Sequence, residues 1–356
     1  MSADLSTNTV IACKGYAAQS SSEQLAPWNF ERRKVGPHDV LIEILYCGVC
    51  HTDIHFLKND LGMTVYPIVP GHEIVGIVRN VGDHVSDFKK GDIAGVGCLV
   101  ESCRTCSSCT EGEEQYCLNG AVYTYNGKEK ETGNNTLGGY SNQIVVNEDF
   151  VLHVSDKLPL DKVAPLLCAG ITTYSPLRRW KIGKSDKVGI VGLGGLGHMA
   201  VKFANSFGAE VTVLSTSPSK EQDALKLGAH KFIVTTNPDK VQALTGYFDF
   251  ILDTVACEHD LNPYLTMLKT HGTLVCLGID PKPVPISVVS MVFGARTLAG
   301  SLIGSLAETQ EMLDYCAEHN ITSDVEMIDM KDINKAYERM QRNDVKYRFV
   351  IDMSTL

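Results

Sequence analysis

Residues 187–208 read KVGIVGLGGLGHMAVKFANSFG, and this stretch decides the fold. Its start, 187–195, predicts an apolar strand that ends in glycines, and 198–208 has the spacing of a helix that ends at a glycine. A strand, a glycine-rich turn and a helix in this order are typical of dinucleotide-binding folds, where a pyrophosphate lies at the helix N-terminus. A glycine-rich turn without a ligand is the alternative. The residues expected to bind the cofactor are Gly192, Gly194, Gly195, Leu196 and Gly197.

The chain after this turn continues to alternate between strands and helices. Apolar runs predict further strands, and a helical pattern at 221–228 separates the first two of them. These strands are expected at 211–215, 231–235, 248–255 and 272–278. Such alternation indicates an α/β fold class with a Rossmann doubly wound parallel sheet.

The two ends of the chain differ from this central part. The first third has strand patterns at 39–49 and 73–82, but glycine and proline interrupt it often, which indicates irregular β structure. The tail predicts two helices and a last strand, at 308–319, 333–341 and 348–352. Because 356 residues are too many for one hydrophobic core, we expect two domains.

Composition limits the class of protein. Hydrophobic residues make up 44% and charged residues 21%, which is ordinary for a globular enzyme. The formal charge of −10 argues against a nucleic-acid partner, and no apolar run approaches the ~18 residues of a membrane span. The N-terminal residues lack the pattern of a secretory signal. Twelve cysteines without such a signal favour a reducing, cytoplasmic location in which thiols serve metals or catalysis.

Four cysteines lie close together at the end of the first third. Cys103, Cys106, Cys109 and Cys117 have the spacing C-x2-C-x2-C-x7-C. Four neighbouring thiolates can complete a tetrahedron around Zn²⁺ and leave no position open, which predicts a structural zinc site. An iron–sulfur cluster, which also uses four cysteines but usually with another spacing, is the alternative.

A second set of candidate metal ligands is dispersed along the chain. Cys50 lies in YCGVCHTDIHF, His72 and Glu73 lie in PGHE, and Cys168 lies in PLLCAGITTY. Two sulfur ligands and one nitrogen ligand from remote segments match a Cys₂His catalytic zinc site, whose fourth position stays open. Structural roles for each residue are the alternative. Cys47 and Cys50 also form a CxxC pair, but the irregular β surroundings disfavour a redox role.

The end of the second Rossmann strand distinguishes two coenzymes. NAD sites usually carry Asp or Glu about 20 residues after the glycines, where it binds the ribose 2′-hydroxyl. Here the nearest acid, Glu210, precedes the strand, and the strand ends in VTVLSTSPSK. Its hydroxyls and lysine suit a 2′-phosphate, so we expect NADP(H), with a merely polar loop and helix cap as the alternative. The residues expected to contact this phosphate are Ser215, Thr216, Ser217 and Lys220.

Several motifs together resemble those of one enzyme family. GHE, the four-cysteine segment, CAGITTYSPL and GLGGLGHMAVK resemble the zinc-dependent medium-chain alcohol dehydrogenases. YCGVCHTDIH, STSPSK and VKYRFVID resemble the cinnamyl-alcohol-dehydrogenase branch and its aldehyde reductases, and the resemblance extends over residues 10–353. It implies a GroES-like catalytic zinc domain at 1–167 and 306–356, with a Rossmann NADP-binding domain inserted at 168–305. It also implies two zinc ions per subunit and a homodimer built through the Rossmann sheets.

The resemblance further implies roles for single residues. The dispersed set matches the family's catalytic zinc ligands, and Glu73 matches a carboxylate able to join them. Thr52 and His55 match a proton relay, and Asp53 matches a partner of the zinc histidine. The alternatives are a surface histidine at His55 and a helix cap at Asp53. The matching cofactor contacts are Thr172 and Arg348.

The implied substrate pocket is apolar and aromatic, which suits medium-sized aromatic or aliphatic aldehydes better than sugars. Its expected residues are Phe56, Leu61, Met63, Cys98, Tyr123 and Leu302. Tyr123 and Leu302 stand where lignin-pathway relatives carry tryptophan and phenylalanine, which leaves the substrate open. The predicted function is reversible hydride transfer between NADPH and such aldehydes. The alternatives are a reductase of C=C or C=N acceptors, an NAD-dependent polyol dehydrogenase, and an NADPH-binding protein without catalysis.

Overall fold

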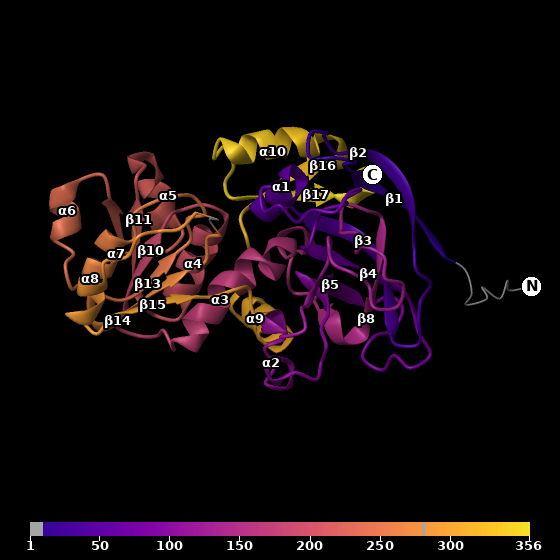
Figure 1. The fold of residues 1–356 in the computed structure, drawn as a ribbon, viewed down its shortest axis with the longest axis horizontal. Helices are drawn as coiled ribbons and strands as arrows, with labels where there is room; N and C mark the ends of the chain where they lie inside the picture. The colour runs from indigo at the N-terminus through magenta and orange to yellow at the C-terminus, as the bar shows by residue number, and fades with distance from the viewer. Residues whose placement is uncertain (1–9, 280–281) are drawn as a thin grey trace, which may run out of the picture. The chain divides into compact units, whose positions relative to one another are not determined.

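The structure is a computed structural model that describes residues 10–279 and 282–356. The chain divides into two compact units: the described residues up to Cys168 with Ser305–Leu356, and the inserted Ala169–Gly304. The first unit thus combines the indigo-to-magenta and the yellow segments of Figure 1. In the described part of the chain, no helix is long and apolar enough to cross a membrane.

The second unit is built on a six-stranded parallel sheet. Its strands are β10 (Lys187–Val191), β11 (Glu210–Ser215), β12 (Lys231–Val234), β13 (Phe248–Asp253), β14 (Leu268–Cys276) and β15 (Thr297–Gly300). Their order is β12-β11-β10-β13-β14-β15, which confirms the predicted doubly wound sheet. β14 begins four residues before the expected 272, because Leu268 pairs with Phe248 ahead of a register shift.

α3 (Ala169–Arg179) precedes the first of these strands, and further helices connect them (Figure 1). The connecting helices are α4 (Gly195–Ser206), η5 (Pro218–Lys220), α5 (Glu221–Lys226), α6 (Pro238–Gln242), α7 (Asn262–Met267) and α8 (Val288–Val292). A parallel sheet is covered by helices on its faces, so its strands consist mainly of apolar residues. The hydrophobic core of this unit includes Leu214, Phe248 and Ile251. The direction of winding reverses between β10 and β13, so the carboxyl ends of these two strands form the expected place for a ligand.

The first unit contains the strands of both chain ends. They are β1 (Ile11–Ala17), β2 (Ala26–Arg32), β3 (Asp39–Gly48), β4 (Ile74–Val81), β5 (Ile93–Val96), β6 (Leu99–Glu101), β7 (Val122–Tyr123), β8 (Gln143–Asn147), β9 (Leu152–His153), β16 (Val325–Asp329) and β17 (Arg348–Asp352). The main sheet has the order β16-β17-β3-β4-β5-β9, with β8 also paired to β3. Because β17 pairs antiparallel with β3, the tail of the chain completes the sheet of the first third.

Short helices fill the connections of the first unit. They are α1 (His51–Lys58), α2 (Ser107–Thr110), η1 (Glu114–Tyr116), η2 (Glu148–Phe150), η3 (Leu160–Lys162), η4 (Ala164–Leu167), α9 (Leu306–His319), η6 (Met330–Asp332), α10 (Ile333–Gln341) and η7 (Met353–Thr355). α9 begins with a capping box in which Ser305 and Glu308 satisfy each other's backbone N–H groups. The structure therefore joins irregular β structure with a Rossmann sheet, as the sequence predicts.

Candidate active site

Cys50 is placed by a sharp change from strand to helix. β3 ends at Gly48, where a Cβ atom would lie 1.9 Å from Glu73 Oε2, so only glycine fits there. Cys50 is the N-cap of α1, and its backbone N–H donates to Asp53 Oδ2 at 2.9 Å. The capping box fixes the first turn of α1 and therefore the direction of the Cys50 thiol.

The dispersed ligand set converges in the first unit. Cys50, His72, Glu73 and Cys168 each offer one ligand atom, and these four atoms lie within 4.8 Å of one another. Cys50 Sγ lies 4.0 Å from Cys168 Sγ, and His72 Nε2 lies 3.3 Å from the same Cys168 sulfur. A tetrahedral site with Zn–S bonds of ~2.3 Å requires sulfurs about 3.8 Å apart. The donor types and their spacing therefore fit zinc.

Asp53 makes the contacts expected of a helix cap and also those expected of a partner of His72, the two roles that the sequence left open. It accepts the Cys50 N–H as a helix cap, and its Oδ1 lies 3.3 Å from His72 Nδ1. Because a carboxylate only accepts, Nδ1 carries the proton and Nε2 keeps its lone pair for a metal. One side chain thus orients the helix and the histidine.

A buried ion pair adjoins the ligand set. Arg348 Nη2 donates to Glu73 Oε1, and both side chains are almost completely buried. Burial raises the pKa of Glu73 to about 8, and the Arg348 guanidinium opposes that rise. Among the described residues, nothing donates a hydrogen bond to Glu73 Oε2. A buried carboxylate oxygen left without a donor is what a neighbouring cation would satisfy.

The predicted proton-relay residues lie on one face of α1. Thr52 and His55 are three residues apart, so their side chains are neighbours on the helix. Thr52 Oγ1 lies 3.6 Å from Cys50 Sγ, whereas the His55 side chain is 36% exposed and its Nδ1 lies 2.9 Å from Asp60 Oδ2. Sequence reasoning missed Asp60. The signal was Asn59, whose left-handed conformation ends α1 and turns Asp60 back toward His55.

The predicted pocket residues differ in their distance from this cluster. The Phe56 ring packs edge-on against Tyr125 with centroids 5.3 Å apart, and Tyr125 lies 5.6 Å from the His72 ring. Cys98 is partly buried, and its thiol interacts with that of Cys168. These contacts place Phe56 and Cys98 beside the ligand set, together with Tyr125, which sequence reasoning missed.

The other predicted pocket residues are more exposed or lie elsewhere. Met63 follows α1 and is 59% exposed, and Tyr123 in β7 is 41% exposed. Leu61 is partly buried in the turn after α1, and Leu302 belongs to the second unit. Their part in a pocket remains a prediction.

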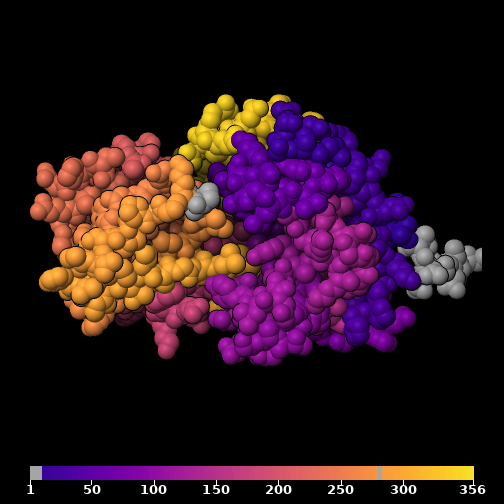
Figure 2. Space-filling view, viewed as in Figure 1, coloured from indigo at the N-terminus to yellow at the C-terminus, as the bar shows by residue number. Residues whose placement is uncertain are grey.

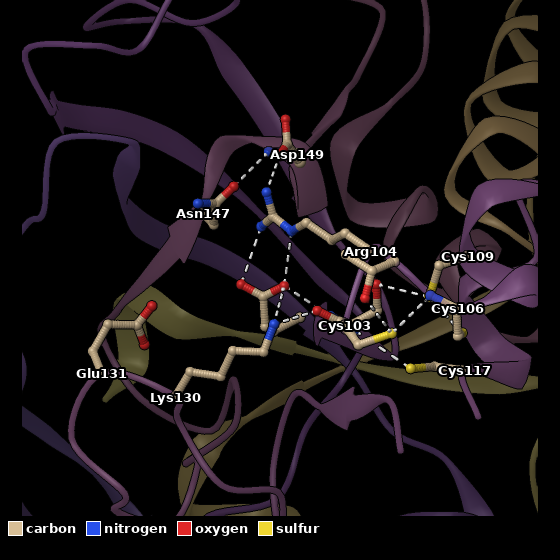
Figure 3. A network of polar contacts seen from close by, with 12 residues as sticks. Cys103, Arg104, Cys106, Cys109, Cys117, Lys130, Glu131, Asn147 and Asp149 are labelled. Atoms are coloured by element: carbon tan, nitrogen blue, oxygen red, sulfur yellow. Dashed lines mark hydrogen bonds and ion pairs between the residues drawn. The ribbon is translucent and has the colours of Figure 1, made fainter. Parts of the chain in front are cut away.

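The four-cysteine segment forms a second ligand set. Cys103, Cys106, Cys109 and Cys117 offer sulfurs within 4.8 Å of one another around α2 and η1. Figure 3 shows the four side chains facing a common point. Backbone N–H groups of Thr105 and Cys106 hold the pKa of the Cys103 thiol at about 5. A thiolate already favoured by the backbone fits a structural zinc site.

An ionic network lies beside this second set (Figure 3). Arg104 has a left-handed backbone with φ +61°, and its guanidinium donates to both carboxylate oxygens of Glu101 at 2.9 and 3.0 Å. Arg104 Nη1 also donates to Asp149 Oδ2, and Lys130 Nζ lies 3.2 Å from Glu101 Oε1. The network joins the cysteine segment to β6 and η2 of the same unit.

The glycine turn of the second unit suits a pyrophosphate. Gly192 has φ +87°, and Gly194 caps α4 with nothing within 4 Å of its Cβ position. A Cβ atom at Gly197 would lie 2.3 Å from Gly192 O, so glycine is needed for close packing of α4 on β10. Gly195 and Leu196 are the first residues of α4, whose N–H groups are available to an anion.

The residues expected to choose the coenzyme surround the end of β11. The Ser217 N–H donates to Ser215 Oγ at 3.2 Å, and Lys220 Nζ donates to Leu193 O in the glycine turn at 2.9 Å. Thr216 lies between the two serines. Glu210 begins β11 at the opposite end of the strand, where it pairs with Lys231. Thr172 is buried in α3, and Arg348 belongs to the first unit.

Comparison with known proteins places these features in a family. Residues 36–156 match the model "Alcohol dehydrogenase GroES-like domain", and residues 195–318 match "Zinc-binding dehydrogenase". A "Probable mannitol dehydrogenase" of Medicago sativa is 52% identical over 96% of this chain and 94% of its own. An "NADP-dependent alcohol dehydrogenase C" of Mycobacterium bovis is 53% identical over 96% and 98%.

A solved structure supports the same assignment. The cinnamyl alcohol dehydrogenase of Sorghum bicolor aligns with a TM-score of 0.94 and 46% identity, over 97% of this chain and 98% of that one. The chain therefore belongs to the zinc-dependent medium-chain alcohol dehydrogenases, as its motifs predict. Within that family it is similar to NADP-dependent and cinnamyl-alcohol members.

Proposed function

We propose that the protein is a zinc- and NADP(H)-dependent alcohol dehydrogenase that interconverts medium-sized aldehydes and their alcohols. The convergence of Cys50, His72 and Cys168 from remote segments carries this proposal, because it creates a Cys₂His site in an enzyme family that reacts at carbonyl carbon. The relatives named for NADP and for cinnamyl alcohol support the coenzyme and the substrate class.

The two cofactors supply the reactive chemistry, since zinc acts as a Lewis acid toward oxygen and the nicotinamide carries a hydride. The protein holds them with the residues described above. Cys50, His72 and Cys168 would hold the catalytic zinc, with Glu73 beside them. Cys103, Cys106, Cys109 and Cys117 would hold the structural zinc. In the second unit the glycine turn, Thr172 and the Ser215–Lys220 segment would hold the dinucleotide. A cofactor contact by Arg348, which belongs to the first unit, stays a prediction.

The proton of the reaction is handled by α1. Reduction of a carbonyl to an alcohol consumes one proton in addition to the hydride, and that proton must come through the protein when water is excluded. Thr52 Oγ1 holds a proton beside the Cys50 sulfur. His55 exchanges it with solvent, because its ring is partly exposed and an imidazole can both accept and donate a proton. Asp60 orients the His55 ring.

Coenzyme choice can be tested with one lysine. Lys220→Ala removes a cation near the 2′-phosphate, and a hydrogen bond to a charged group is worth ~1.5–3 kcal/mol, so kcat/KM for NADPH should fall about 10- to 100-fold. The value for NADH should stay nearly constant. Lys226→Ala on exposed α5 is the matched control. A wild-type enzyme that prefers NADH contradicts the NADP(H) assignment.

Metal dependence can be tested by chelation. Removal of the catalytic zinc should abolish aldehyde reduction, while NADPH binding, followed by its fluorescence, should persist because the dinucleotide sites lie on other residues. Full activity in metal-free protein contradicts the proposal. Retained binding without any aldehyde reduction in the zinc-loaded enzyme would favour a non-catalytic NADPH-binding protein.

A substrate panel separates the remaining alternatives. Aromatic rings beside the zinc ligands, such as Phe56 and Tyr125, favour aromatic and aliphatic aldehydes. One relative is described as a probable mannitol dehydrogenase, so mannitol with NAD and with NADP belongs in the panel. Conjugated alkenes and iminium ions complete it. If the enzyme turns over any of these compounds faster than cinnamaldehyde, the proposed substrate class is wrong and that compound's class replaces it.

The second unit supports the proposal of a homodimer. β15 is an edge strand of the Rossmann sheet. The apolar helix α8 precedes β15 in the chain; its last residue, Val292, is 69% exposed, and the C-cap residue Phe293 is 88% exposed. Orange atoms of this part of the chain lie on the face turned to the viewer in Figure 2. Sheet edges and exposed apolar helices are ready partners for a second copy.

The dimer can be tested by sedimentation. Phe293→Asp should shift the protein toward monomer, whereas Leu225→Asp, on exposed α5 of the same unit, should not. A wild-type monomer at micromolar concentration contradicts the dimer. A cytoplasmic location is also proposed, since no disulfide joins any of the twelve cysteines, all of which lie in the described residues.

A further inference from the structure

The carboxylate of Asp53 is fully buried and accepts from four directions. Its Oδ1 lies 3.2 Å from the Gly71 N–H and 3.3 Å from His72 Nδ1. Its Oδ2 accepts from the Cys50 N–H at 2.9 Å and from the Tyr140 hydroxyl at 3.0 Å. A carboxylate offers about four lone-pair positions, so these four donors occupy its acceptor positions and fix its orientation.

Tyr140 is the one side-chain hydroxyl among these donors, and it is held rigidly. The ring is completely buried. Its backbone N–H donates to Pro70 O at 3.0 Å, so Tyr140 is tied to the loop that carries His72. A Cβ atom at Gly71, which has φ +100°, would lie 2.7 Å from Tyr140 Cδ1, so the glycine permits this close approach. The ring cannot move without moving the ligand loop.

A second tyrosine, from the tail of the chain, sets the direction of the Tyr140 hydroxyl. Tyr337 lies in α10, is 5% exposed, and its hydroxyl donates to the Tyr140 oxygen at 3.3 Å. Because Tyr140 accepts from Tyr337, its own proton points to Asp53. Burial raises the pKa of both phenols well above the usual value, so both remain donors. The hydrogen bonds therefore run from Tyr337 through Tyr140 to Asp53 and meet His72 there.

We propose that Tyr140 and Tyr337 are positioning residues of the catalytic metal site, which fix the Asp53 carboxylate and through it the orientation of the His72 ring. The inference rests on the proposed function, because it assumes that His72 holds zinc. Residues that orient a metal ligand typically change metal affinity about 10- to 100-fold when they are removed. Tyr140 acts directly on Asp53, and Tyr337 acts through Tyr140.

The test measures how firmly the catalytic metal is held. Tyr140→Phe, Tyr337→Phe and the double variant are compared with wild type by the rate of zinc transfer to a chromogenic chelator. The visible absorption of the cobalt-substituted catalytic site reports its ligand geometry. Tyr66→Phe is the matched control, because its hydroxyl also bonds within this unit, to Leu57 O in α1 at 2.7 Å, but does not reach Asp53. Zinc release from the four-cysteine site provides an internal measure of folding.

The expected effects form a series. Tyr140→Phe should release catalytic zinc about 10-fold faster and change the cobalt spectrum. Zinc release from the four-cysteine site should stay unchanged. Tyr337→Phe should have a smaller effect in the same direction. The double variant should match Tyr140→Phe, because Tyr337 acts only through Tyr140. If Tyr140→Phe does not fold, a faster release in Tyr337→Phe than in Tyr66→Phe supports the inference.

Other outcomes overturn it. If all variants hold the metal as firmly as Tyr66→Phe and keep the cobalt spectrum, the tyrosines do not position the site. If the effects of the two single variants multiply in the double variant, Tyr337 does not act through Tyr140. A wild-type protein that holds no second zinc instead contradicts the proposed function itself.

Discussion

The two metal-ligand sets of this protein are built in opposite ways. The four-cysteine set comes from a single short segment, 103–117, and three of its four residues are partly exposed. The second set, which we propose holds the catalytic zinc, joins Cys50, His72 and Cys168, which are separated by up to 118 positions, and all three residues are buried. The first set needs only a local loop. The second needs a complete folded unit.

The two sets also differ in the groups that support their ligand atoms. In the local set, neighbouring backbone N–H groups support the sulfurs, as at Cys103 and Cys106. In the dispersed set, distant side chains provide this support, namely Asp53 beneath His72 and Arg348 beside Glu73. Damage to the local site should therefore cost stability, whereas damage to the dispersed site should cost catalysis.

The largest expected effect is the loss of a catalytic ligand. Cys50→Ser should remove one zinc per subunit and lower kcat about 10³-fold or more, since a Lewis-acid metal supplies several kcal/mol. Elemental analysis and aldehyde reduction measure both changes. Cys13→Ser, another buried cysteine of the same unit, is the control and should keep both metals. If Cys50→Ser keeps wild-type turnover with only one zinc per subunit, the dispersed set is not the catalytic site.

Loss of a ligand from the four-cysteine set should have a different effect. Cys106→Ser should also remove one zinc, but the cost should appear as a melting temperature roughly 5–10 °C lower and faster proteolysis within 103–117. Below that temperature kcat should stay within about threefold of wild type, because the catalytic set is built from other residues. Calorimetry and limited proteolysis provide the measurement. A loss of turnover as large as that of Cys50→Ser would show that the two sites are not separable.

Thiol accessibility sharpens the comparison. In metal-free protein, a soluble thiol reagent should modify Cys103 and Cys106 at least about ten times faster than Cys50 and Cys168, because Cys103 and Cys106 are partly exposed whereas Cys50 and Cys168 are buried. Backbone N–H groups lower the pKa of the Cys103 and Cys106 thiols, but the hydrogen bond with Cys168 also lowers the pKa of Cys50, so the expected difference rests on exposure. Mass spectrometry of timed samples gives the order. Equal rates would mean that the dispersed set loses its fold without metal.

The smallest effect is expected for the ionic network. Arg104→Ala should speed zinc release from the four-cysteine set only a few-fold, since partly exposed ion pairs contribute about 0–1 kcal/mol. The effect should shrink at high salt. Lys128→Ala, on an exposed residue of the same unit, is the control. A large effect that is independent of salt would assign Arg104 a role beyond charge pairing.

Local patterns in the sequence predict much of the fold. The glycine turn, α10 and β17 follow the expected residues closely, because periodicity and glycine positions are read within one segment. The early start of β14 was not predicted, because Leu268 joins the sheet through pairing with Phe248 rather than through its own neighbours. The same holds for Asp60, whose approach to His55 depends on the left-handed turn at Asn59.

By itself, the sequence determined the parts that depend on neighbouring residues: the Rossmann turn, the polar segment after β11 and the four-cysteine set. It also indicated Cys50, His72 and Cys168 as one Cys₂His set, but spacing along the chain could not show that their ligand atoms meet. Tertiary structure alone decided that their ligand atoms meet within 4.8 Å and that Tyr140 and Tyr337 close the hydrogen bonds beneath them. The physical reason is that spacing along the chain fixes local geometry, whereas contacts between remote side chains exist only after the sheet has formed.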